Sequence, residues 1–249
     1  MSGHSKWHSI KHKKGAADAK RGKLFTKIIK EITVAARLGG GDLDANPRLR
    51  TVVAKAKEAN MPKDNIENAI KKGTGELEGY NLEEISYEGY GPNGVAIMID
   101  ALTDNRNRTT ADIRSILTKS GGNLGENGCV SWIFEKKGVL TLSVEKYDEN
   151  TVMEVALDAG ADDIQEVDNV WEVTTTPENY ETVHTAFAEK GMELMVSDIM
   201  RVPKTTVKLD EKAAAKVLSL MEKLEDNDDI QNVASNFDIP DEILQNIGE

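Results

Sequence analysis

The chain has 249 residues, of which 39% are hydrophobic and 30% are charged, and its formal net charge is −12. This composition is that of an ordinary globular protein with one large domain or two or three small ones. It contains no run of about 18 apolar residues, which excludes a membrane-spanning helix, and its single cysteine, Cys129, excludes an internal disulfide. The amino terminus lacks the apolar core of a secretory signal, so we expect a soluble cytoplasmic protein.

The positive charge is concentrated in the first third of the chain. Residues 1–72 carry 17 Lys and Arg against 7 Asp and Glu, whereas the other 177 residues carry 14 against 36. Such an asymmetry indicates a polyanion partner, because backbone phosphates supply most of the non-specific affinity of proteins for nucleic acids. We therefore expect the functional site in the basic third.

Three helices are predicted in this third, after a basic arm. Apolar residues at helical spacing predict a helix over residues 18–38, with an apolar side formed by Leu24, Phe25, Ile28, Ile29 and Ile32. Asn46-Pro47 predicts the capped start of a second helix that runs to about residue 60. Pro62 opens a third helix that continues to Lys72, and Gly73 is its predicted cap.

Beyond residue 79 the pattern changes to strands and helices. Strands are predicted over 85–90, 95–102, 129–135, from 139 onward, and over 164–167, 170–175, 192–198, 205–209 and 230–236. Helices are predicted over 109–119, 149–157, 178–190 and 211–224. The order βαββαβ after residue 139 is that of a ferredoxin-like unit. The segment that follows is too short for a domain, so we expect its strand to pair with the sheet that begins near residue 80.

The predicted fold class is therefore α+β, an amino-terminal three-helix module plus two α/β sandwich-type domains, the third ferredoxin-like and inserted in the second. The predicted boundaries are 1–78 for the arm and three-helix domain, 79–135 with 204–249 for the discontinuous α+β domain, and 136–203 for the ferredoxin-like domain. The two later domains are acidic and would repel nucleic acid, which orients the basic module toward it.

The arm from Gly3 to Gly15 combines cations, hydroxyls and one tryptophan. Lysine ammonium groups suit phosphates, and the Trp7 indole suits stacking on an unpaired base. We predict nucleic-acid contacts for His4, Lys6, Trp7, His8, Lys11, His12, Lys13 and Lys14. A solvated, disordered tail is the plain alternative. The three histidines recur every fourth residue, but no cysteine or carboxylate lies near them, so we do not expect a metal site.

The helix after the arm continues the positive charge. Glu31 is the only acidic residue between Lys20 and Arg37, so this face has almost no compensating charge within its own segment. A solvated face is the default interpretation of exposed lysines, but a single-sign face that continues a basic arm favours a polyanion partner. We predict phosphate contacts for Lys20, Arg21, Lys23, Lys27 and Lys30, and for Arg48 and Arg50 on the next helix.

A secondary anion site is predicted at the start of the helix over residues 109–119. Arg106 and Arg108 lie beside its amino terminus, where unpaired N–H groups attract anions. A capped helix with two exposed arginines explains the same residues equally well. The segment Gly89–Gly94 formally matches G-x-G-x-x-G, but it lies between two strands and is better interpreted as a hairpin turn.

The sequence gives no support for catalysis. It contains no nucleophile elbow, Walker sequence or zinc-ligand spacing, so we expect no enzyme activity, no metal and no cofactor. A metal-dependent nuclease would need clustered carboxylates, and the candidates for such a cluster are Glu88, Asp100 and Asp104.

Several motifs in the first half of the chain resemble one known family. They are Gly3-His-Ser-Lys-Trp7, Ile10-Lys-His-Lys-Lys14, Arg21-Gly-Lys-Leu-Phe25, Asn46-Pro-Arg-Leu-Arg50, Ala59-Asn-Met-Pro62, Ile70-Lys-Lys-Gly73, Tyr87-Glu-Gly89, Thr103-Asp-Asn-Arg-Asn-Arg-Thr109 and Gly121-Gly-Asn-Leu-Gly125. Together they resemble the YebC family of bacterial proteins, which includes a mitochondrial translational activator. The resemblance implies a helical amino-terminal domain, two α/β domains and nucleic-acid binding. Beyond Glu135 it depends on layout more than on motifs.

The resemblance leaves two functions open. Members are commonly described as DNA-binding transcriptional regulators of the cytoplasm, while others look like ribosome-associated factors that assist translation of difficult sequences such as proline runs. Lysine acts mainly as a point charge, which predicts weak base specificity, and a lysine-rich arm with one stacking aromatic suits a folded RNA site. We expect a transcriptional regulator; the alternative is a translation factor that binds ribosomal RNA on the ribosome. The sequence does not give the oligomeric state.

Overall fold

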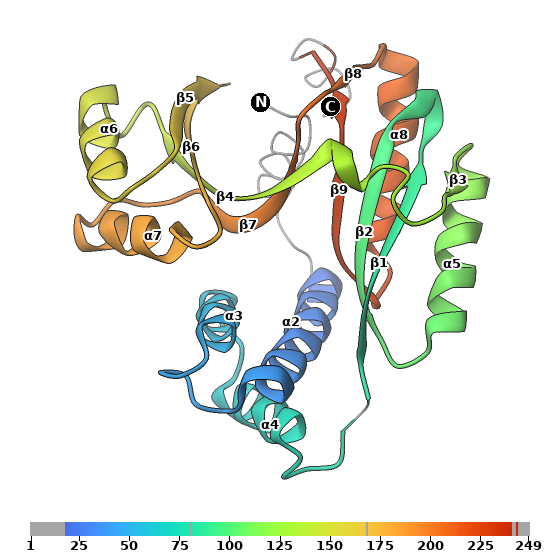
Figure 1. Ribbon diagram of the computed structural model, residues 1–249, viewed down its shortest axis with the longest axis horizontal. Coiled ribbons are helices and arrows are strands. Elements are labelled where there is room, and N and C mark those ends of the chain that lie inside the picture. Colours follow the sequence, from blue (N-terminus) through green and yellow to red (C-terminus); the bar gives the residue numbers. More distant parts are fainter. Residues whose placement is uncertain (1–17, 80, 168, 241–242, 244–249) are drawn as a thin grey trace.

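The computed structural model describes residues 18–79, 81–167, 169–240 and 243, and for residues 18–20 it describes the backbone only. Helices come first in this part of the chain, and two four-stranded antiparallel sheets with flanking helices follow (Figure 1). No helix within these ranges is long and apolar enough to cross a membrane. The predicted α+β class is confirmed.

The amino-terminal helices are α2 (Asp18–Gly39), α3 (Pro47–Glu58) and α4 (Lys63–Thr74). Their buried side chains form one cluster of Ile28, Ile32, Ala35, Ala36, Leu49, Val52, Val53, Ala56, Met61, Ile66 and Ala69. Asn46 joins two of the helices, because its side chain accepts from Leu49 N and donates to the Ala35 and Gly40 carbonyls. The three-helix prediction therefore agrees with the structure.

Two details of these helices differ from the sequence prediction. Leu24 is 47% exposed and lies outside the core that Ile28 and Ile32 join. Helix α4 continues through Gly73, and its cap is Gly75, whose φ of +83° is readily adopted by glycine. Gly73 instead allows the close approach of α4 to α2, because a Cβ there would lie 2.4 Å from the Thr33 carbonyl oxygen.

The first sheet has the strand order β3-β1-β2-β9. Its strands are β1 (Glu83–Tyr90), β2 (Ala96–Thr103), β3 (Asn123–Leu124) and β9 (Ile230–Ser235). Helices α5 (Arg106–Lys119) and α8 (Glu211–Glu225) share one apolar cluster with β2 and β9. The predicted return of the chain is confirmed, because β9 pairs antiparallel with β2 and Ile97 lies opposite Ser235.

Short elements complete this part of the fold. The hairpin between β1 and β2 turns through the 3₁₀ segment η1 (Pro92–Gly94), as the turn prediction required, and Asn93 has a φ of 61° there. Strands β8 (Val207–Lys208) and β10 (Phe237–Asp238) form a small parallel pair. The short β8 takes the place of the predicted strand over 205–209.

The second sheet has the order β5-β6-β4-β7, which is the ferredoxin-like arrangement predicted from the βαββαβ pattern. Its strands are β4 (Phe134–Ser143), β5 (Asp163–Val167), β6 (Val170–Thr175) and β7 (Val196–Pro203). Helices α6 (Glu149–Asp158) and α7 (Tyr180–Glu189) cover one face and share its apolar cluster. Figure 1 shows both helices on the same side of this sheet.

Two predicted strands are displaced. Residues 129–133 are not a strand, because the Glu88 carboxylate accepts backbone N–H bonds from Gly128, Val130 and Ser131 and holds this segment in a turn. The turn includes η2 (Ser131–Ile133), and one continuous strand, β4, then begins at Phe134. The last strand begins at Val196 instead of residue 192, because Met192 N donates to the Phe187 carbonyl and its side chain joins the helix-side core.

The chain enters the second sheet through β4 and leaves it through β7. These two strands pair with each other from Phe134 opposite Pro203 to Thr141 opposite Val196. At the junction, Arg201 of β7 binds Asp100 of β2 through two nitrogens at 3.1 and 3.0 Å. Such a two-point contact fixes direction as well as distance. The predicted domain boundaries at 78/79, 135/136 and 203/204 stay a prediction.

The close approach at Gly73 predicts a large difference between two glycine substitutions. Gly73→Ala should lower the free energy of unfolding by about 2 kcal/mol, because the new methyl group meets the α2 backbone. Gly22→Ala is the matched control in α2, where nothing lies within 4 Å of the added Cβ, and it should stabilise by up to about 1 kcal/mol. Urea denaturation of both variants measures this difference, and equal stability would contradict the packing described.

Candidate nucleic-acid interface

The predicted contact residues divide into a part that the structure describes and a part that it does not. His4, Lys6, Trp7, His8, Lys11, His12, Lys13 and Lys14 lie outside the described residues, and Lys20 is described only as backbone within α2. Their proposed contacts therefore stay predictions. Arg21, Lys23, Lys27, Lys30, Arg48 and Arg50 are described with their side chains.

Three lysines form a row on α2. Lys23, Lys27 and Lys30 are spaced by four and three residues, which places them on one side of a helix. Their side chains meet the segment from Glu225 to Asp229, which joins α8 to β9 and which we call the acidic corner. The row therefore faces an internal partner in this structure.

Each lysine of the row has an oxygen partner in the acidic corner. The Nζ of Lys23 lies 3.1 Å from Asp226 Oδ1 and 3.2 Å from the Asp226 carbonyl oxygen. Lys27 donates to the Glu225 carbonyl at 2.6 Å. Lys30 donates to the Asp228 carbonyl at 2.9 Å and to Asp229 Oδ1 at 2.7 Å. The charge that compensates this face thus comes from a segment distant in sequence.

The position of the corner at the end of α8 explains this pairing. Glu225 is the last residue of α8 and Asp226 is its cap. The last carbonyls of a helix lack intrahelical partners and carry the negative end of the helix dipole, so cations are favoured there. Lys23 and Lys27 therefore cap the carboxyl end of α8 through the Asp226 and Glu225 carbonyls.

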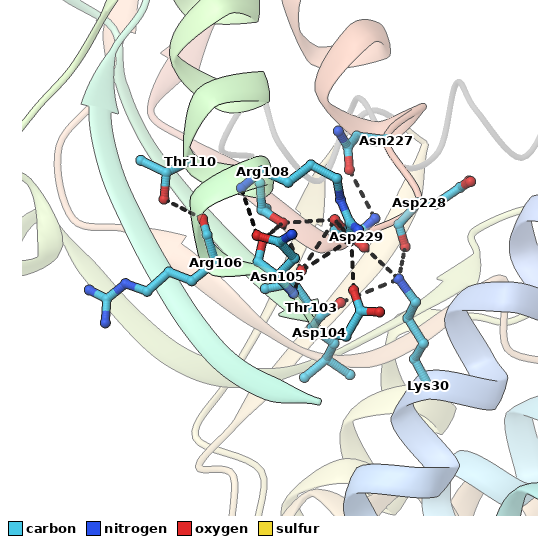
Figure 2. A network of polar contacts seen from close by, with 12 residues as sticks. Lys30, Thr103, Asp104, Asn105, Arg106, Arg108, Thr110, Asn227, Asp228 and Asp229 are labelled. Carbon is cyan, nitrogen blue, oxygen red and sulfur yellow. Dashed lines mark hydrogen bonds and ion pairs between the residues drawn. The ribbon is translucent and has the colours of Figure 1, made fainter. Parts of the chain in front are cut away.

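Asp229 is the inner end of the corner and the centre of a polar network (Figure 2). Its side chain is 8% exposed and accepts from Lys30 Nζ at 2.7 Å, Arg108 at 2.8 Å and Thr109 Oγ1 at 2.7 Å. Burial alone would raise the pKa of Asp229, but the hydrogen bonds from Lys30, Arg108 and Thr109 outweigh it and lower the pKa from 3.8 to about 2. The group is therefore ionised at neutral pH.

The predicted secondary anion site at the start of α5 holds this internal carboxylate. Arg108 binds both Asp104, at 2.9 Å, and Asp229. Asn105 caps α5 by accepting from Arg108 N. Arg106 is exposed, and Figure 2 shows its side chain pointing away from the network. In this structure Arg108 joins the network and Arg106 does not, and the secondary anion site stays a prediction.

Two of the remaining predicted arginines, Arg48 and Arg50, make intramolecular contacts away from the lysine row. Arg48 pairs with Glu84 of β1, and this hydrogen bond raises the pKa of Arg48. Arg50 donates to the Leu43 and Asp44 carbonyls at 3.0 and 3.3 Å, which holds the loop before α3. Arg21 is exposed near the start of α2. Arg48 and Arg50 thus make intramolecular contacts in this structure, and their phosphate contacts stay predictions.

A charged contact that the sequence did not indicate joins α3 to the second sheet. Lys55 of α3 lies 2.6 Å from Asp198 of β7, and both side chains are partly exposed. Burial opposes the charge of Lys55, but Asp198 and Glu31 outweigh it and raise the pKa of Lys55. Burial also raises the pKa of Glu31, in spite of the attraction of Lys55. The two partners are 143 residues apart, so no local pattern could have revealed the pair.

The carboxylates considered for a nuclease site have separate partners. Asp100 binds Arg201 and accepts from Ser86, and Asp104 binds Arg108. Burial would raise the pKa of Glu88, but the three backbone N–H bonds from residues 128–131 outweigh it and lower the pKa. No group of three potential metal ligands occurs within the described residues. The described geometry gives a nuclease site no support.

A cavity of about 500 Å³ lies beside the lysine row, between α2 and the acidic corner. Lys30, Lys72 and Arg108 line it together with Asp104, Asp112, Asp228 and Asp229. Cations and carboxylates are mixed in its wall, so it is not a single-sign pocket for an anion. The row itself, and not this cavity, remains the candidate phosphate contact.

Comparison with known proteins identifies the family. A model described as the TACO1/YebC protein N-terminal domain matches residues 5–76, and one described as the TACO1/YebC second and third domain matches residues 82–237. The chain belongs to the TACO1/YebC family. The resemblance inferred from the motifs is confirmed.

Relatives in this family match over nearly the whole chain. A probable transcriptional regulatory protein of Syntrophobacter fumaroxidans is 61% identical over 248 residues, which cover 99% of this chain and 100% of the relative. One of Desulforapulum autotrophicum is 58% identical and covers 98% of each chain. The crystal structure of a conserved hypothetical protein, Aq1575 of Aquifex aeolicus, is similar with a TM-score of 0.82 and 50% identity, covering 92% of this chain and 94% of that one.

The low pKa of Asp229 predicts a pH-dependent contribution to stability. A carboxylate with a folded pKa of about 2 and an ordinary value of 3.8 stabilises the fold above about pH 4, and this contribution is lost as the pH falls toward 2. Asp229→Asn should lower the free energy of unfolding by about 2 kcal/mol at pH 7 and by less at pH 3. Urea denaturation at both pH values measures this, with the exposed Asp158→Asn as control. An equal loss at both values would contradict the network.

Proposed function

We propose that this protein is a nucleic-acid-binding regulatory protein, and that it acts as a DNA-binding transcriptional regulator. The observation that carries the proposal is the row of Lys23, Lys27 and Lys30, which directly follows the lysine-rich arm and binds oxygen acceptors. Ammonium groups that bind carboxylate and carbonyl oxygens bind phosphate oxygens by the same chemistry. The names of the relatives, probable transcriptional regulatory proteins, support a regulatory role.

The distribution of charge supports binding through one end of the molecule. Residues 1–72 have ten more basic than acidic residues, and residues 73–249 have 22 more acidic than basic residues. A nucleic acid is attracted by the first part and repelled by the rest, which orients the protein before contact. The two sheets would then project away from the backbone of the nucleic acid.

The identity of the cations supports weak sequence specificity. The proposed contacts come mainly from lysines, which neutralise phosphates but do not read base edges in the bidentate manner of arginine. Arg37, Arg48 and Arg50 of the helices have intramolecular partners in Asn81, Glu84 and the Leu43 carbonyl. We therefore propose that backbone contacts dominate affinity.

A translation factor that binds ribosomal RNA on the ribosome is the second candidate. It uses the same cations, and the sequence feature that favours it is Trp7 within the arm, because a single large aromatic is suited to stacking on an unpaired base. The two candidates differ in the nucleic acid that binds best, so one set of titrations separates them.

Replacement of Lys11, Lys13 and Lys14 by Glu should weaken binding to duplex DNA by at least about tenfold, because it reverses three phosphate contacts. For the wild-type protein, about six phosphate contacts predict a fall in affinity of roughly a thousandfold between 50 and 200 mM salt. Fluorescence anisotropy measures both effects, and circular dichroism reports whether the variant stays folded.

The matched control reverses three exposed lysines outside the basic third, Lys190, Lys212 and Lys216. It changes the net charge equally and should alter the affinity by less than about twofold. Equal losses in the two variants would show that only net charge matters and would contradict the assignment of the arm. Tighter binding of a ribosomal RNA hairpin than of duplex DNA would favour the translation factor.

Trp7→Ala tests the stacking role separately. If Trp7 stacks on an unpaired base, the substitution should weaken binding to single-stranded RNA by about 1–3 kcal/mol, with a smaller loss for duplex DNA, whose bases are paired. Anisotropy titrations with both ligands at the same salt concentration give the comparison. Equal losses would exclude stacking as the role of Trp7.

A further inference from the structure

The acidic corner occupies the same lysines that the proposed function assigns to phosphates. We propose that residues 225–229 are an autoinhibitory contact, an internal polyanion that covers Lys23, Lys27 and Lys30 until the backbone of a nucleic acid displaces it. This inference depends on the proposed function and adds to it a form of regulation within the chain. Free protein is then closed at the corner, and bound protein is open there.

The chemistry of the corner matches that of a phosphate backbone. Three successive cations meet Asp226, the Glu225 carbonyl, and the Asp228 carbonyl with the Asp229 carboxylate. Each acceptor is an anionic or strongly polar oxygen, so a phosphate can replace each contact without leaving an ammonium group unpaired. The exchange is therefore between like interactions, and its direction depends on the concentration of the polyanion and on salt.

The polar and apolar parts of this interface are separated along α2. The apolar cores of the amino-terminal helices and of the first sheet are distinct. A small cluster of Val34, Leu82 and Leu102 joins α2 to the first sheet. At a rise of 1.5 Å per residue, Val34 lies about 16 Å along the helix from Lys23 but about 6 Å from Lys30, whose Nζ also donates to the Leu102 carbonyl at 3.4 Å. The helices can thus swing away from the corner about this cluster, because polar interfaces between parts of one chain permit relative motion.

The strength of the contacts decreases from the inner to the outer end of the corner. Lys30 and Asp229 have side chains that are 19% and 8% exposed, whereas Lys23 and Asp226 are 45% and 67% exposed. Exposed ion pairs contribute little and are screened by salt, so the outer end opens first. When Lys30 moves away from the corner, Asp229 keeps its hydrogen bonds from Arg108 and Thr109. Opening therefore does not leave the buried carboxylate without partners.

The first test removes the charge of the corner and keeps Asp229. A variant with Glu225→Gln, Asp226→Asn and Asp228→Asn should bind duplex DNA roughly tenfold more tightly than wild type at 50 mM salt, because the competitor loses up to three charges. The matched control is Glu154→Gln with Asp158→Asn and Glu189→Gln on α6 and α7, where the three acids are also partly or fully exposed. The control changes net charge equally and should alter the affinity by less than about twofold.

A second test closes the corner covalently. Lys23→Cys with Asp226→Cys, in a Cys129→Ser background that removes the only native thiol, is joined with a short bismaleimide. The joined protein should bind duplex DNA at least about tenfold more weakly than the same variant with its thiols capped by N-ethylmaleimide, since both forms lack the same charges. Duplex DNA added before the reagent should lower the yield of joined protein.

The outcomes separate this inference from the proposed function. If wild-type protein binds DNA with a steep salt dependence, but the corner variant binds no more tightly than its control, the autoinhibitory contact is refuted and the proposed function stands. Equal affinity of the joined and capped proteins would refute it in the same way. If wild-type protein binds neither duplex DNA nor RNA at 50 mM salt, both proposals fail.

Discussion

The arrangement of the molecule depends on one buried carboxylate, Asp229, which lies where α2, α5 and the edge of the first sheet meet. A buried charge must be paired, and its partners come from three segments: Lys30 from α2, Arg108 and Thr109 from the start of α5, and Thr103 from the end of β2. This one group therefore sets the position of the basic helices relative to the acidic body. Arg108 and Thr109 bind Asp229 independently of α2, so the carboxylate keeps partners when Lys30 moves away.

This constraint gives the α2 lysines two roles that compete. As partners of the acidic corner, they hold the amino-terminal helices against the first sheet. As a row continuous with the basic arm, they are suited to phosphates. Apart from the small apolar cluster of Val34, Leu82 and Leu102, several contacts between the parts are charged, such as Arg48 with Glu84, Lys55 with Asp198 and Arg201 with Asp100. Electrostatic contacts of this kind give an arrangement that responds to salt and to polyanions more than an apolar interface does.

Local sequence patterns predicted most elements, because periodicity and turn residues act within a few positions. Asn46-Pro47 gave the start of α3, and the βαββαβ order gave the second sheet. What local patterns could not show depends on groups that are distant in the sequence. Glu88 bends residues 129–133 into a turn that their apolar character does not indicate, and the lysine row of α2 meets acids about 200 residues later. A helical wheel shows which side is charged, but it does not show what that side contacts.

The most direct test of the account is ultraviolet crosslinking of the full-length protein in growing cells, with identification of both the crosslinked peptides and the nucleic acid recovered. We predict crosslinked peptides within the first 58 residues, which contain the arm, α2 and α3, and enrichment of DNA over background. Crosslinks confined to the acidic sheets would contradict the central claim that the basic third makes the contacts. Recovery of one ribosomal RNA region, with DNA at background, would keep the interface and assign it to translation.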